Sequence, residues 1–164
     1  MKKDTTVILA LFPNVVGLGY VCLENPQTLL KAGIMQVRPM SNKKALNHVK
    51  DLVGIFNPKI VILRDFDTHK PRKNKRIQQL LNEITTYAKE KHIRTFQYSR
   101  QQIRDVFELH GATSKYEISK QIITWFPTLA DRAPKKRKPW LPEDSKMGIF
   151  DAMALAIAHE HLNE

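Results

Sequence analysis

The sequence predicts a mixed α/β fold, in which helices flank a sheet of about five strands. Short apolar segments separated by turn-forming residues fill residues 6–38, and helical and strand-like patterns alternate after them. The chain has 164 residues, which is an ordinary size for a single domain. We therefore expect one domain over residues 1–164, with strands first and alternating elements after them.

The first part of the chain predicts an antiparallel meander of three strands. Its apolar segments cover residues 6–12, 17–23 and 31–37. Pro13-Asn14 and Asn25-Pro26 lie between these segments, and both pairs are typical of turns. A helix is predicted next over residues 41–56, because Ser41 is a favoured N-cap residue and apolar residues then recur every three or four positions.

A strand-helix-strand unit is predicted in the middle of the chain. Residues 59–63 form a continuous apolar run, which is typical of a strand buried on both faces. Residues 77–88 have a helical period, and residues 93–98 indicate another strand. Two strands joined in this way lie parallel, with a right-handed connection.

Three more helices are predicted in the last third of the chain. Ser99 can cap a helix that reaches about residue 110, and Thr113 or Ser114 can cap another that reaches about residue 125. Residues 148–162 are rich in alanine and predict a terminal helix. Between the last two helices we expect a basic, proline-rich loop over residues 127–144.

The charge balance points to a polyanionic partner. Lys and Arg number 27 against 16 Asp and Glu, which gives a formal net charge of +11. Nucleic acid is the first expectation, and an anionic membrane surface is the second. No apolar run is long enough for a transmembrane helix, so we expect a soluble protein. The single cysteine, Cys22, is expected to pack as a small apolar residue, and its isolation fits a reducing, cytoplasmic environment.

Three segments resemble the RuvC family of Holliday-junction resolvases, within the RNase H-like superfamily. They are the helix-loop-helix stretch of residues 98–118, the terminal helix of residues 150–159, and residues 8–14 with Gly19-Tyr20. The resemblance implies an RNase H-like mixed five-stranded sheet, binding of branched or duplex DNA such as a four-way junction, no membrane partner, and a two-fold homodimer.

The resemblance also implies where a nuclease centre would lie. Members of the family hold divalent metal with four carboxylates, and here those positions are Phe12, Arg64, Gly148 and Asp151. Only Asp151 keeps a carboxylate. Asp65 follows Arg64, but adjacent residues of a strand point to opposite faces. We therefore expect a lost or altered centre with no bound metal or other cofactor, in which Asp151 and Asp65 are the remaining catalytic candidates. If a metal does bind, Asp151 is its expected ligand.

The alternative is an active structure-selective endonuclease that uses Mg²⁺ or Mn²⁺. Its substitute ligands beside Asp151 would come from Asp65, Asp67 and Asp4, or from Glu143 and Asp144. For the lost centre, the sequence predicts that the Phe12 ring packs near Ala152 or the stem of Arg64 and that Asp151 pairs with Arg64. A third possibility is an assembly subunit that keeps the fold only for protein contacts.

The candidate DNA-binding residues come from the resemblance and from two basic loops. The resemblance implies that Arg104 and Lys115 contact the DNA backbone, and Lys115 lies at a helix start, which also attracts phosphate. The loops near residues 68–76 and 127–144 contribute Lys70, Arg72, Lys73, Lys135, Lys136 and Arg137. Each basic loop is an equally good candidate for a solvated surface.

Trp140 and the two histidines near the end of the chain are predicted to have structural rather than catalytic or DNA-binding roles. Trp140 is expected to anchor its loop to the body of the protein rather than to stack on a base. His159 and His161 are expected at the surface or at a dimer contact, because residues two apart on a helix do not face each other and neither can share a site with Asp151.

Overall fold

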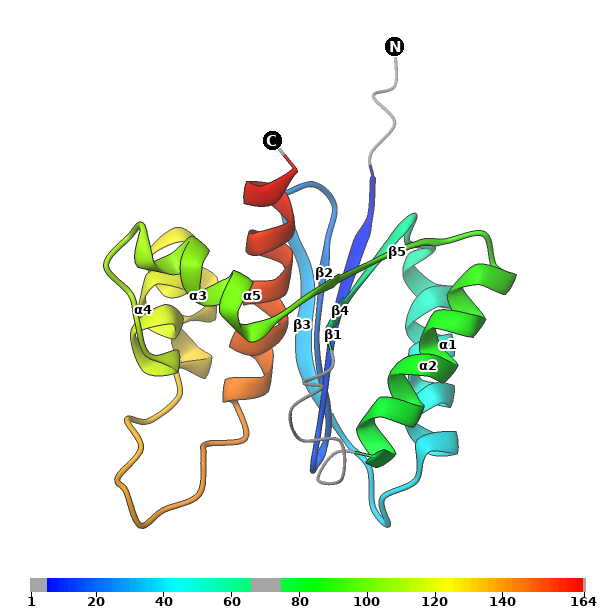
Figure 1. Cartoon of the computed structure of the whole chain (residues 1–164), viewed down its shortest axis with the longest axis horizontal. Coiled ribbons are helices and arrows are strands. Elements are labelled where there is room, and N and C mark those ends of the chain that lie inside the picture. The colour runs from blue at the N-terminus through cyan, green and yellow to red at the C-terminus, as the bar shows by residue number, and fades with distance from the viewer. Residues whose placement is uncertain (1–5, 66–74, 164) are drawn as a thin grey trace.

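The computed structural model describes residues 6–65 and 75–163, which form one α/β layer structure (Figure 1). Its strands are β1 (Ile8–Asn14), β2 (Gly17–Leu23), β3 (Leu29–Gln36), β4 (Ile60–Arg64) and β5 (Arg94–Tyr98). Its α-helices are α1 (Asn42–Phe56), α2 (Lys75–Glu90), α3 (Arg100–Glu108), α4 (Lys115–Trp125) and α5 (Met147–Leu162). Every strand and helix that the sequence predicts is present, with ends shifted by a few residues.

The five strands form one mixed sheet in the order β3-β2-β1-β4-β5. β1 pairs antiparallel with β2, and β2 with β3, which confirms the predicted meander. β1 also pairs parallel with β4, and β4 with β5, as the predicted strand-helix-strand unit requires. β1, β4 and β5 therefore end at the same edge of the sheet, and side chains that follow these strands lie close together.

The sheet separates two hydrophobic layers. Ile8 and Ala10 of β1 belong to the layer under α5, whereas Leu9 and Leu11 belong to the layer under α1 and α2. This alternation follows from the two-residue period of a strand. α5 lies on one face with α3 and α4 outside it, and α1 and α2 cover the other face (Figure 1). Phe12 continues the alternation and packs against the α5 layer.

The start of α5 lies directly on β2 because two glycines leave room for it. A Cβ atom at Gly19 would come within 2.1 Å of the Gly148 carbonyl oxygen, so the two backbones are in contact. Alanines at positions 152, 154, 156 and 158 are buried around the helix, which lies between the sheet on one side and α3 and α4 on the other. This close packing brings Asp151, in the first turns of α5, over the end of β1.

Serine side chains fix the starts of three helices. Ser41 accepts a hydrogen bond from the Lys44 N–H, and Ser99 and Ser114 each form a reciprocal capping box. Ser114, rather than Thr113, is therefore the N-cap of α4. The structure also confirms that Cys22 is fully buried, and burial raises the pKa of its thiol to about 11.

Two predicted positions are wrong. His159 is buried, not at the surface: its Nδ1 lies 2.6 Å from the Tyr98 hydroxyl, and burial followed by nearby Arg94 lowers its pKa. His161 is exposed as predicted. Trp140 does not anchor its loop, because 76% of it is exposed. The loop is instead held by Arg132, which donates to the Ala32 carbonyl, and by buried Pro134.

The predicted loop over 127–144 also begins with a short 3-10 helix, Pro127–Arg132, started by the proline. Among the residues that the structure describes, no helix is both long and apolar enough to span a membrane.

Candidate nucleic-acid interface

An open cleft lies at the edge of the sheet where β1 and β4 end. Its volume is about 880 Å³, and its described lining comes from the end of β1 and the β1–β2 turn, the end of β4, α3, the start of α4, the loop that leads into α5, the first turns of α5, and Ile77 of α2. These parts meet because parallel strands end at one edge and α5 begins over the same edge.

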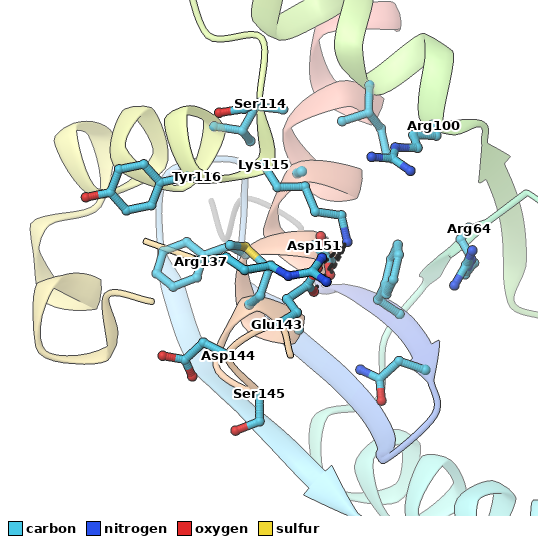
Figure 2. A pocket seen from close by; sticks show the side chains of 18 of the residues that line it. Arg64, Arg100, Ser114, Lys115, Tyr116, Arg137, Glu143, Asp144, Ser145 and Asp151 are labelled. Atoms are coloured by element: carbon cyan, nitrogen blue, oxygen red, sulfur yellow. Dashed lines mark hydrogen bonds and ion pairs between the residues drawn. The ribbon is translucent and has the colours of Figure 1, made fainter. Parts of the chain in front are cut away.

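Basic side chains dominate the charged lining of the cleft. Of the charged side chains that line it within the described residues, seven are basic and three are acidic; the basic ones are Arg64, Arg100, Arg104, Lys115, Lys135, Lys136 and Arg137. Arg100 and Arg104 are four residues apart on α3, a spacing that puts both on one helix face. Arg100, Lys115 and Arg137 approach the cleft from different elements in Figure 2. The lining is therefore suited to bind an extended polyanion.

The Phe12 ring lies between two of these cations. The Arg64 guanidinium carbon is 4.5 Å from the ring centroid, and the Lys115 ammonium is 5.8 Å from it. Arg64 also donates a hydrogen bond to the Pro13 carbonyl at 3.2 Å. Phe12 lies beside Arg64 as predicted, but it contacts the guanidinium rather than the predicted aliphatic stem, with the geometry of a cation–π interaction.

Lys115 also contacts two carboxylates, and dashed lines in Figure 2 mark both contacts. Its Nζ lies 3.3 Å from Glu143 Oε2 and 3.5 Å from Asp151 Oδ2. The predicted pairing of Asp151 with Arg64 is therefore wrong: Lys115 is the ion-pair partner, and Arg64 acts on Asp151 only through a longer-range attraction. Strand β4 directs Arg64 over Phe12, whereas α4 begins opposite α5 and directs Lys115 at Asp151.

Asp151 is a nearly buried carboxylate. Burial raises its pKa from 3.8 to about 6, and the repulsion from Glu143 adds to the rise, while Lys115 and Arg64 lower it. The loss of hydration therefore outweighs the attraction of two neighbouring cations. The charged form of Asp151 depends on those cations and is sensitive to any change in them.

The remaining candidate ligands do not gather around Asp151. Asp144 points away from Lys115 in Figure 2, and its oxygens accept hydrogen bonds from the backbone N–H groups of Lys135 and Lys146. Asp65 is exposed and does not line the cleft. Within the described ranges 6–65 and 75–163, no three His, Cys, Asp or Glu side chains are close enough to hold one metal ion. Asp4 and Asp67 lie outside those ranges.

The donor set therefore fits a divalent metal poorly. Among the described residues, Glu143 and Asp151 are the two carboxylates that meet at one point, and the Lys115 ammonium already contacts both of them. A phenyl ring and a guanidinium stand on the β1 and β4 side, where a metal needs oxygen ligands.

The cleft brings together all five of the predicted DNA-binding residues that the structure describes. Arg104, Lys115, Lys135, Lys136 and Arg137 all line it. Lys70, Arg72 and Lys73 lie outside the described residues. Sequence reasoning missed Arg100, although its spacing from Arg104 is a usable signal. It also missed the Lys115–Glu143 contact, which joins residues 28 positions apart and leaves no local pattern.

Comparison with known proteins identifies the fold. No protein-family model matches the sequence, and a search of curated proteins finds no match either. Among solved structures, RuvC from Thermus thermophilus superimposes with a TM-score of 0.66 at 18% identity, covering 96% of this chain and 95% of that one. A structure of T. thermophilus RuvC in complex with a Holliday junction substrate gives a TM-score of 0.68 at 16% identity, covering 96% and 94%.

A third similar structure is the yeast mitochondrial Holliday junction resolvase Ydc2. Its TM-score is 0.65 at 11% identity, and the match covers 94% of this chain and 77% of that one. All three matches extend over nearly the whole of this chain, and the sheet order and flanking helices agree with the RNase H-like expectation. The chain therefore has a RuvC-like fold of the RNase H type.

Proposed function

We propose that this protein binds branched or duplex DNA in the basic cleft and that its ordinary metal-dependent nuclease centre is lost. The observation that carries the proposal is the set of seven basic side chains that line one cleft at the strand-end edge of the sheet. A net charge of +11 strengthens attraction to phosphate over the whole molecule. The similarity to structures of Holliday junction resolvases supports the same class of ligand.

The proposed loss of the nuclease centre depends on what surrounds Asp151. Two-metal cleavage requires several carboxylate oxygens that clamp the attacking and leaving oxygens. Here Phe12 and Arg64 occupy the side of β1 and β4, and Lys115 supplies the positive charge next to Asp151. The retained charge then favours binding of phosphates rather than of Mg²⁺ or Mn²⁺.

The binding experiment compares two charge-matched double variants. Arg104→Ala with Lys135→Ala removes two exposed cations from the cleft, and Lys43→Ala with Lys89→Ala removes two exposed cations from α1 and α2 on the other face. Fluorescence anisotropy with a labelled four-way junction at about 0.1 M salt should show about tenfold weaker binding for the cleft variant only. Equal losses in both variants would contradict binding in the cleft.

The second candidate is a structure-selective endonuclease with a non-standard carboxylate set. It is favoured by one observation, that Asp151 and Glu143 face the same cation and could exchange it for a metal. A four-way junction incubated with Mg²⁺ or Mn²⁺ tests this candidate. Cleavage that Asp151→Asn abolishes would establish the endonuclease, and an uncut junction supports the binding protein.

We also propose that the protein acts as a homodimer. A four-way junction has two-fold symmetry, and a two-fold dimer would present two such clefts to it. Light scattering at about 10–50 µM protein, a range suited to weak association, should give twice the mass of the chain. A monomer at these concentrations would contradict the proposal. A protein that binds no DNA but retains a stable partner in pull-down would favour the assembly subunit.

A further inference from the structure

The turn between β1 and β2 carries two exposed valines into the cleft. Val15 is 78% exposed and Val16 is 36% exposed, and both line the cleft together with Arg64, Arg100 and Arg104. Turn positions favour Gly, Asn, Asp, Pro and Ser, so a pair of β-branched apolar residues is unusual there. In Figure 1 this turn lies at the end of the sheet where the loop before α5 also lies.

The backbone of this turn is held rigidly from several sides. Asn14 Oδ1 accepts hydrogen bonds from the N–H groups of Val16 and Gly17, at 3.0 and 3.1 Å. The Val16 carbonyl accepts from the Val37 N–H at 3.0 Å. Gly17 has a φ of 151°, and a Cβ there would meet the Met35 carbonyl oxygen at 1.8 Å. The turn is therefore packed tightly against the strand behind it.

Two arginines brace the same turn from the chain segments beside it. Arg64 donates to the Pro13 carbonyl, and Arg76 donates to the Asn14 carbonyl at 3.0 Å. Asn42 holds Arg76 in place through two hydrogen bonds: its side-chain amide donates to the Arg76 carbonyl, and its Oδ1 accepts from the Arg76 guanidinium. The result is a fixed apolar tip with guanidinium groups at its base, and a rigid tip loses little conformational entropy when it binds.

We propose that the Val15–Val16 tip is a wedge that packs against unstacked bases at the branch point of a four-way junction. Apolar side chains inserted between base steps are a known means of holding distorted DNA. Phosphates on either side of a branch point would meet the basic lining of the cleft, while the bases that the branch exposes offer apolar faces to the tip. The proposal rests on the proposed function and adds the residues that distinguish branched from continuous duplex DNA.

The test compares Val15→Ser with the matched control Ile55→Ser. Ile55 is 70% exposed on α1, on the opposite face of the sheet, so both changes remove an exposed β-branched side chain. Affinities for a four-way junction and for a linear duplex of the same length are measured in the same buffer. Val15→Ser should weaken junction binding about fivefold to tenfold and leave duplex binding within about twofold, from the apolar area of one valine.

A second readout follows the bases directly. With 2-aminopurine at the branch point, binding of the unaltered protein and of Ile55→Ser should change the fluorescence, and binding of Val15→Ser should change it much less. A junction-to-duplex affinity ratio unchanged by Val15→Ser would overturn the wedge while leaving the proposed function intact. Failure of the unaltered protein to bind either DNA would refute the proposed function itself, and the wedge with it.

Discussion

Lys115 Nζ lies 3.5 Å from Asp151 Oδ2, and the same ammonium group lies 3.3 Å from Glu143 Oε2. Lys115 is the first residue of α4, and Asp151 lies in the first turns of α5, so the contact joins two helices across the floor of the cleft. One cation thus faces two carboxylates. The electrostatics of the cleft depend on this group of three side chains.

The buried carboxylate of Asp151 should make stability depend on pH. Because burial raises its pKa from 3.8 to about 6, the folded protein binds a proton between these pH values that the unfolded chain releases. The contribution of Asp151 to the free energy of unfolding therefore falls as pH rises from about 4 to about 6 and stays lower above. The full shift corresponds to about 3 kcal/mol. Asp151→Asn should remove this dependence and stabilise the protein at pH 7 by about 1–3 kcal/mol.

Urea unfolding of both proteins at pH 4 and pH 7 measures this difference. Glu143→Gln is the control, because Glu143 is exposed and its ion pair should contribute less than about 1 kcal/mol. An Asp151→Asn variant less stable than the unaltered protein at pH 7 would show instead that the Lys115 ion pair outweighs the cost of burial.

Removal of the Glu143 charge should strengthen DNA binding. Its carboxylate neutralises part of the Lys115 charge and would repel phosphates entering the cleft. An exposed ion pair contributes about 0.2–1 kcal/mol, so Glu143→Gln should raise affinity for a four-way junction by up to about fivefold. Glu90→Gln, at an exposed carboxylate that ends α2, is the matched control and should have little effect. Weaker binding by Glu143→Gln would mean that Glu143 positions Lys115 rather than opposes DNA.

Restoring one carboxylate should not create a nuclease. In Phe12→Asp the new carboxylate would stand between the Arg64 guanidinium and the Lys115 ammonium, and it would pair with them. The positions of Arg64 and Gly148 would still lack metal ligands. A four-way junction incubated with Mn²⁺ should remain uncut by this variant, as judged on a denaturing gel. Metal-dependent cleavage by Phe12→Asp would show that the other ligands are already present.

The contact between β2 and α5 should be intolerant of a single methyl group. Gly19→Ala would place a Cβ 2.1 Å from the Gly148 carbonyl, so the helix must move away from the sheet. Overpacking of this kind costs about 1–3 kcal/mol. Gly54→Ala, in α1 with nothing within 4 Å of the added Cβ, is the control and should be neutral or slightly stabilising. Equal thermal stability of Gly19→Ala and the unaltered protein would contradict the close packing.

Most of the fold follows from local patterns in the sequence. The three apolar segments before residue 38, the buried run of β4 and the serine caps of α1 and α3 are each determined within a few neighbouring residues. The errors arise where tertiary contacts decide. His159 has a polar side chain near a helix end, but the Tyr98 hydroxyl of β5 satisfies it and allows burial, and Asn163 at the C-cap of α5 donates to the same hydroxyl. Trp140 is large and apolar, yet the loop around it is held by Arg132 instead.

The site could be predicted only in part for the same reason. The resemblance to RuvC identified Phe12, Arg64 and Asp151 as neighbours, and the strand alternation explains why Phe12 and Arg64 share a face. It did not identify Lys115 as the partner of Asp151, because the direction of α4 depends on how the α3–α4 turn packs on α5. A role for Arg100 and for the Val15–Val16 tip could not be predicted from the sequence, because only the structure shows that they line the same cleft.

The proposal that the basic cleft binds DNA without a metal is best tested by measuring four-way-junction binding in EDTA over a range of salt concentrations. If the cleft binds phosphates without a metal, the logarithm of the association constant should fall linearly with the logarithm of salt concentration. About four or more phosphate contacts from the seven lining cations give a slope of about −4 or steeper. A slope near zero, or binding that occurs only after Mg²⁺ or Mn²⁺ is added, would contradict metal-independent binding of phosphates in the cleft.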